Sequence, residues 1–142
     1  MKIFIINLII MSFGMLCKAQ VTINSSQLEG TKWEQVVPLN KKFRSIHSYS
    51  KTKETTEFVF EQKNTRTSLE YTYYLSPVEV RVFDHSKVGT NTSGCFLITY
   101  NLKTKIVSSC KIIKFDKEKG IMTWCMHGGL NKNMTIDFYM IK

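Results

Sequence analysis

The chain has 142 residues, with 20 lysines and arginines against 11 acidic residues and a formal net charge of +9 at pH 7. This length suits one domain that buries a substantial core. The basic residues are interspersed with acids, as over residues 114–119, and no run of five like charges occurs. This pattern is typical of a solvated surface and argues against a basic nucleic-acid-binding arm, so we expect no nucleic-acid partner.

The N-terminus has the pattern of a secretory signal peptide. Lys2 precedes an apolar stretch over residues 3–16, which is shorter than the roughly 20 residues that span a bilayer comfortably. Small residues, Cys17 and Ala19, lie three positions and one position before a cleavage site that precedes Gln20. The pattern therefore predicts export rather than membrane anchoring.

We accordingly assign residues 1–19 to a signal peptide and residues 20–142 to one domain, located in the periplasm or outside the cell. Lipid attachment at Cys17 is a less favoured alternative, because Leu16 directly precedes it and the lipoprotein signal has leucine three positions before its cysteine. Two of the basic residues and none of the acids lie in the signal, which leaves 123 residues with a net charge of +7. We expect no transmembrane segment in this mature chain.

The mature chain alternates apolar and polar residues with a period of two, as β-strands do. Ser26, followed three residues later by Glu29, predicts one short helical turn before the strands begin. Pro77 must lie at a bend or an edge. Strands are expected over residues 32–37, around Phe58 and Phe60, over 43–50, 69–75, 94–101, 105–115, 120–127 and 134–141, and through Val78, Val80 and Val82. About eight short strands joined by polar turns predict an all-β fold, either a single barrel or a two-sheet sandwich.

Four segments add a family resemblance. They are LEGTKW over residues 28–33, FVF over 58–60, YTYYLS over 71–76 and GCFLI over 94–98. In this order they resemble the small exported lipocalin-like (calycin) domains of bacteria, over most of the mature chain. The resemblance implies a single antiparallel up-and-down β-barrel of about eight strands, whose interior can hold one small ligand. It supplies no catalytic residues.

Three mature cysteines, Cys95, Cys110 and Cys125, lie fifteen residues apart. If two-residue turns at 102–103 and 117–118 join the strands that carry them, Cys110 lies directly opposite both of the others. All three thiols would then share one face of three neighbouring strands, with cross-strand Cβ distances of about 4.5–5.5 Å.

This arrangement leaves three hypotheses open. The favoured one is three reduced cysteines that act as small apolar side chains. A disulfide between Cys110 and either Cys95 or Cys125 is the second, since export permits oxidation. The third is a soft-metal site for Cu(I) or Zn²⁺ that also uses His127. We expect no cofactor.

The opposite face of the same strands is more continuously apolar, so we expect it to face the interior. It carries Phe96, Ile98, Tyr100, Val107, Ile113, Met122, Trp124 and Met126. Together with Phe58, Phe60, Tyr71 and Tyr73 it would line a ligand cavity or form a plain core. The residues that we assign to a ligand site are Tyr71, Tyr73, Phe96 and Trp124.

The functional expectation is a non-enzymatic exported binding module that takes a small apolar or amphipathic molecule into its barrel. The alternative is a filled barrel that acts through its surface as an inhibitor or envelope interaction protein, which the bulky interior favours. Asp84, His85 and Ser86 have the residue types of a hydrolase triad, but triad members meet through the fold rather than as sequence neighbours. His47 is isolated in the sequence. We therefore expect no catalysis.

Overall fold

The computed structural model describes residues 20–36, 43–126 and 134–142. The predicted signal peptide, with Cys17, and His127 of the predicted metal site lie outside these residues. Within them, no helix is long and apolar enough to cross a membrane.

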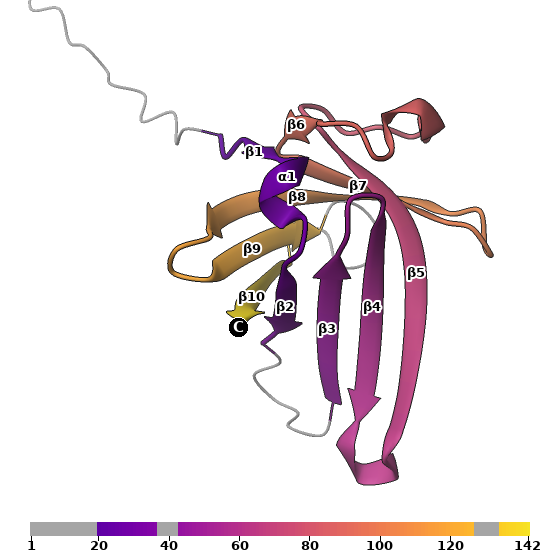
Figure 1. Ribbon diagram of the computed structural model, residues 1–142, viewed down its shortest axis with the longest axis vertical. Helices are drawn as coiled ribbons and strands as arrows, with labels where there is room; N and C mark the ends of the chain where they lie inside the picture. Colours follow the sequence, from indigo (N-terminus) through magenta and orange to yellow (C-terminus); the bar gives the residue numbers. More distant parts are fainter. Residues whose placement is uncertain (1–19, 37–42, 127–133) are drawn as a thin grey trace, which may run out of the picture.

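Eight antiparallel strands form a closed barrel in which sequence neighbours pair and β10 pairs back to β2 (Figure 1). The predicted all-β up-and-down barrel is confirmed, and the two-sheet alternative is wrong because this last pairing closes the sheet. The strands in order around the barrel are β2 (Lys32–Gln35), β3 (Phe43–Tyr49), β4 (Lys53–Phe60), β5 (Thr65–Ser76), β7 (Phe96–Asn101), β8 (Val107–Asp116), β9 (Ile121–Met126) and β10 (Thr135–Ile141).

One end of the barrel is closed by the short helix α1 (Ser25–Leu28), which Figure 1 shows beside the start of β2. The helical turn was predicted, but its first turn is held by Gln27 Oε1, which accepts from the Asn24 N–H at 2.8 Å. Leu28 is completely buried. The core below α1 consists of Ile23, Leu28, Trp33, Tyr49, Tyr73, Leu75, Leu97, Ile112, Met122, Trp124 and Phe138.

Residues 77–92 leave the barrel and cover its outer face. The strand predicted through Val78, Val80 and Val82 was wrong, because β5 ends at Ser76 and β7 takes the place beside it. The excursion contains Phe83, which packs against Tyr74 and Ile98 in a second, smaller cluster. The alternating valines are therefore not part of a strand, because no neighbouring strand is available to pair with them.

The excursion returns through β6 (Ser93–Gly94), which pairs with β1 (Ile23–Asn24) in a separate two-stranded ladder. Gly94 lies against the end of β5. A Cβ at this position would lie 2.0 Å from the carbonyl carbon of Ser76, so only glycine fits this crossing. The remaining elements are two short 3-10 turns. They are η1 (Glu61–Lys63), which follows β4, and η2 (His85–Lys87), which lies in the excursion.

The connection from β7 to β8 is longer than predicted. Tyr100 pairs with Val107 rather than with Lys105. The cause is Asn101, whose Oδ1 accepts from the backbone N–H groups of Lys103 and Thr104, while its carbonyl accepts from the Lys105 N–H. This side-chain-stabilised turn shifts the register by two residues.

The next hairpin is shifted as well. Cys110 pairs with Met126, because a β-bulge between Ile112 and Lys114 inserts one extra residue into β8. A shift of one residue turns a side chain to the other face of a strand. The predicted alignment of three thiols on one face was therefore wrong.

Candidate functional site

Four polar side chains meet inside the barrel on two neighbouring strands. Ser45 and His47 come from β3, and Glu54 and Thr56 come from β4. The register pairs His47 with Thr56, and residues two apart share a strand face, so all four point inward. Their exposed fractions are 1%, 8%, 3% and 4% respectively.

These side chains form one hydrogen-bonded network, here called the interior polar cluster. Ser45 Oγ lies 2.9 Å from His47 Nε2, and His47 Nδ1 lies 2.8 Å from Glu54 Oε1. Thr56 Oγ1 donates to the same carboxylate oxygen at 3.3 Å. Buried polar groups are retained in proteins when they are paired in this way.

Two neighbouring aromatic rings, whose centroids lie 4.3 Å from each other, contact the imidazole of His47. Trp124 of β9 and Phe138 of β10 both lie with their ring centroids 5.1 Å from that of His47, at interplanar angles of 80° and 85°. These edge-to-face contacts fix the plane of the imidazole. The interior polar cluster on β3 and β4 is therefore also held by side chains from β9 and β10.

A cavity of about 180 Å³ lies beside the interior polar cluster. Its inner wall is buried and includes Leu97 and Trp124, whereas Ser108, at its outer side, is exposed. The cavity therefore opens away from the end that α1 closes. The lining residues are His47, Glu54, Thr56, Phe58, Tyr71, Leu97, Thr99, Ser108, Cys110 and Trp124.

The indole N–H of Trp124 is buried and has no hydrogen-bond partner among the described residues. A buried donor without an acceptor costs free energy, about 1–3 kcal/mol when nothing replaces water. Because Trp124 lines the cavity, an acceptor atom on a bound molecule could satisfy this donor.

Burial and the negative charge of Glu54 act together on the acidic groups nearby. Burial, followed by the charges of Glu54 and Cys125, raises the pKa of the Cys110 thiol to about 12. Burial, followed by Glu29 and Glu54, raises the pKa of Tyr73 to about 12. Both groups therefore remain protonated at neutral pH, and Cys110 presents an uncharged thiol to the cavity.

The structure brings together only some of the residues assigned to a ligand site from sequence. Tyr71 and Trp124 line the cavity. Tyr73 lies in the core below α1, where its hydroxyl donates to the Ser50 carbonyl at 2.7 Å. Phe96 lies outside the barrel in the second cluster, contrary to the expected inward face, because Phe83 of the excursion covers the outer face of β7 that carries Phe96 and Ile98.

The cysteines are separated in the same way. Cys110 packs against the barrel core, while Cys125 follows the inward-facing Trp124 and so points to the outer face. Cys95 is buried just before β7, with Gln20 Nε2 against its sulfur. The structure has all three as free thiols and joins neither of the two pairs of the disulfide hypothesis. The described residues contain no group of three His, Cys, Asp or Glu side chains that could hold a metal ion.

Sequence analysis missed the interior polar cluster because His47 has no chemical partner close to it in the sequence. The available signal was the strand alternation itself. Ser45 and His47 share a face with Phe43 and Tyr49, and a polar pair on an otherwise aromatic face is unusual. The pairing with Glu54 needed the β3–β4 register as well.

The geometry of this network also resembles a Ser-His-acid relay. In a hydrolase the serine must reach a substrate carbonyl. Ser45 is 1% exposed and is not among the residues that line the cavity. Its hydroxyl therefore orients the imidazole from behind, and His47, Glu54 and Thr56 are the members that a bound molecule can contact.

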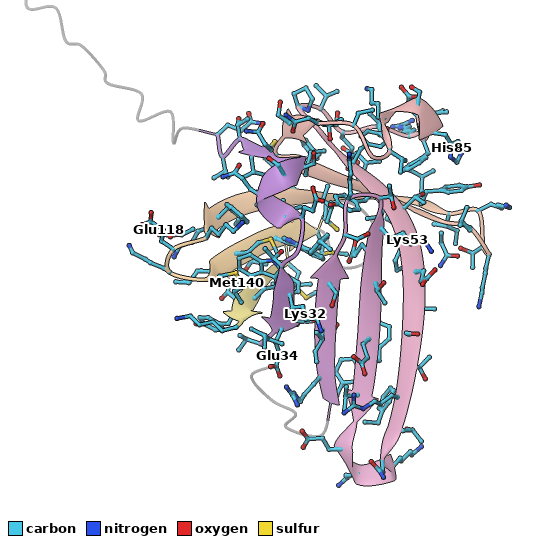
Figure 2. The ribbon with its side chains drawn as sticks, in the orientation of Figure 1. Lys32, Glu34, Lys53, His85, Glu118 and Met140 are labelled. Carbon is cyan, nitrogen blue, oxygen red and sulfur yellow. The ribbon has the colours of Figure 1, made fainter. Side chains whose placement is uncertain are left out.

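The adjacent Asp84, His85 and Ser86 lie elsewhere, on the excursion at the periphery of the molecule, where Figure 2 labels His85. Asp84 Oδ1 accepts from the backbone N–H and the hydroxyl of Ser86. These bonds hold the pKa of Asp84 below its usual value. The three residues form a turn, which is the role that their adjacency indicates.

Fold and site together define a class: a closed, eight-stranded antiparallel barrel with a polar cluster and a small cavity in its interior. Comparison with protein-family models found no match to this chain, and searches of curated proteins and of solved structures found none either.

Proposed function

We propose that this chain is an exported, lipocalin-like, non-enzymatic binding protein that holds a small amphipathic molecule in the barrel cavity. The observation that carries the proposal is the cavity itself, because it interrupts an otherwise packed interior and has two kinds of wall. Phe58, Leu97 and Trp124 offer apolar surface, while His47 and Glu54 offer hydrogen bonds. Ligand sites in proteins combine these features.

The size of the cavity limits the ligand. A volume of about 180 Å³ is below the roughly 300–1,000 Å³ of drug-sized pockets and close to the roughly 150 Å³ that holds a benzene ring. The proposed ligand is therefore one ring, or a short chain of similar bulk, with one or two polar groups. The filled, surface-acting alternative would leave this space without a role.

The experiment is an NMR titration of the mature protein with benzyl alcohol, a single-ring amphipathic probe. We expect saturable shifts with a Kd of about 0.1–1 mM, which is the range that so small a ligand reaches. Thr99→Phe should abolish saturation, because Thr99 lines the cavity and the larger ring fills it. Leu102→Phe is the matched control, because Leu102 is 50% exposed in the β7–β8 turn.

Failure of the wild type to saturate with benzyl alcohol would overturn the proposal. So would unchanged binding by folded Thr99→Phe, since the probe would then occupy another part of the surface. Retained binding by Leu102→Phe together with loss in Thr99→Phe would support the cavity as the site.

A further inference from the structure

We infer that the cavity selects a small organic cation, such as a protonated primary amine attached to a ring, with Glu54 as its counter-ion. This inference rests on the proposed function and names its ligand class. The charges that line the cavity are the first observation that supports it. Glu54 is the one acidic residue in the described lining, and no lysine or arginine contributes to that lining.

All the hydrogen bonds of the interior polar cluster can be made with a neutral His47. With a neutral imidazole, Ser45 Oγ–H donates to Nε2, and Nδ1–H donates to Glu54, so every proton has an acceptor. A protonated imidazole would donate through Nε2–H to Ser45, whose own hydroxyl proton would then need another acceptor. His47 is the partner that the described residues provide for that hydroxyl.

A neutral His47 leaves the carboxylate of Glu54 with a full negative charge at 3% exposure. Hydrogen bonds from His47 and Thr56 stabilise this charge, but they do not neutralise it. A buried unpaired charge is unfavourable, so a cation that enters the cavity gains a strong, poorly screened attraction. Burial first, and then this negative charge, raise the pKa values of Tyr49 and Cys110.

The aromatic lining favours the same class of ligand. Trp124, Tyr71 and Phe58 all border the cavity that Glu54 borders. The faces of aromatic rings attract cations, most strongly for tryptophan and when water is excluded. A cavity lined by one carboxylate and three aromatic side chains attracts a cation and repels a carboxylate or a phosphate.

The test compares benzylamine, which is protonated at pH 7, with benzyl alcohol and phenylacetate, which are neutral and anionic rings of similar size. We expect benzylamine to bind the wild-type protein at least about tenfold more tightly than benzyl alcohol, a difference of about 1.4 kcal/mol. Phenylacetate should bind more weakly than benzyl alcohol. This wild-type series needs no substitution, so it decides the question even if a cluster variant fails to fold.

Glu54→Gln should remove the preference for benzylamine, so that the ratio between the affinities for benzylamine and benzyl alcohol falls from about tenfold to about one. The matched control is Glu57→Gln, which removes one negative charge from the same strand, where Glu57 is paired with Arg66 at 3.0 Å. That pair lies on the outer face, so the control should keep the preference.

The outcomes separate the two proposals. If benzyl alcohol binds as tightly as benzylamine or more tightly, or if Glu54→Gln keeps the preference, the cation inference is wrong and the binding function stands. If benzyl alcohol does not bind the wild-type protein, the proposed function is overturned and the cation inference, which rests on it, falls with it.

Discussion

The two halves of the barrel interior are built from the same strands but filled with different chemistry. Below α1, Leu28, Trp33 and Ile112 form part of an apolar core, and each of them is 0% exposed. Towards the other end, the inward positions of β3 and β4 carry the interior polar cluster, and a cavity of about 180 Å³ opens beside it. The comparison indicates that one half provides stability, whereas the other gives up packing for a charged, accessible site.

The largest expected loss of stability comes from a substitution in the apolar half. Trp33→Ala should lower the free energy of unfolding by about 3–5 kcal/mol, because it removes a completely buried indole and leaves the Thr31 hydroxyl without the indole donor that now lies 2.7 Å away. Urea denaturation followed by far-UV circular dichroism measures this change.

The control for Trp33→Ala is Tyr139→Ala, because Tyr139 is an aromatic residue on β10 that is 54% exposed. Its loss should cost about 0.5 kcal/mol or less. Equal losses in the two variants would contradict the conclusion that the apolar half of the barrel provides its stability.

A smaller effect is expected in the polar half. His47→Leu should cost about 3 kcal/mol, because it leaves the Glu54 carboxylate buried without its imidazole partner. Adding Glu54→Leu should recover part of that loss, since two apolar residues can replace a buried pair at little cost. A double-mutant cycle in urea measures the coupling.

The surface pair Arg44 and Glu34 provides the comparison for this cycle. Its side chains are 42% and 31% exposed, and exposed pairs contribute about 0–1 kcal/mol. Arg44→Ala should therefore change stability by less than about 1 kcal/mol. A double variant of His47 and Glu54 that is less stable than His47→Leu alone would show that the pair contributes packing and not only charge compensation.

The smallest effect is a loss of stability at alkaline pH. The pKa of Cys110 is raised from 9.0 to about 12 in the fold, so the unfolded chain releases this proton first. The contribution is fully present below pH 9 and is lost progressively as the pH rises towards 12. We expect a decrease of about 1–2 kcal/mol between pH 9 and 11, measured as unfolding midpoints in urea.

Cys110→Ala should flatten this pH dependence, although the raised pKa of Tyr73 leaves part of it in place. Cys125→Ala is the control, since Cys125 lies on the outer face. If the wild-type protein gained stability from pH 9 to 11, the pKa of the Cys110 thiol would be lowered by folding rather than raised, and the prediction would be wrong.

The strand pattern was predictable because successive side chains of a strand point alternately into the barrel and away from it. In β5, Tyr73 and Leu75 face inward as their spacing predicts, and β3, β4 and β10 lie close to their expected positions. The valines after Pro77 show the limit of this signal. They alternate like a strand, but no partner strand lies beside them, and Val82 is 83% exposed.

Register was less predictable than strand position because it depends on single residues at turns and bulges. The Asn101 side chain lengthens one turn, and the extra residue at Ile113 turns later side chains to the other face. These two local features separated the cysteines, whereas Phe96 lies outside the barrel because the excursion covers that face of β7. Tyr71 and Trp124 line the cavity because their side chains point into the barrel as predicted.

The sequence by itself determined an all-β domain with a basic surface, one short helical turn and strands with one buried face each, because composition and period-two alternation are local properties. Only the tertiary structure decided that the sheet closes into a barrel and that His47 meets Glu54 beside an open cavity. Those features depend on pairing between strands. That pairing is set by how the whole barrel packs and by where its turns and bulge fall.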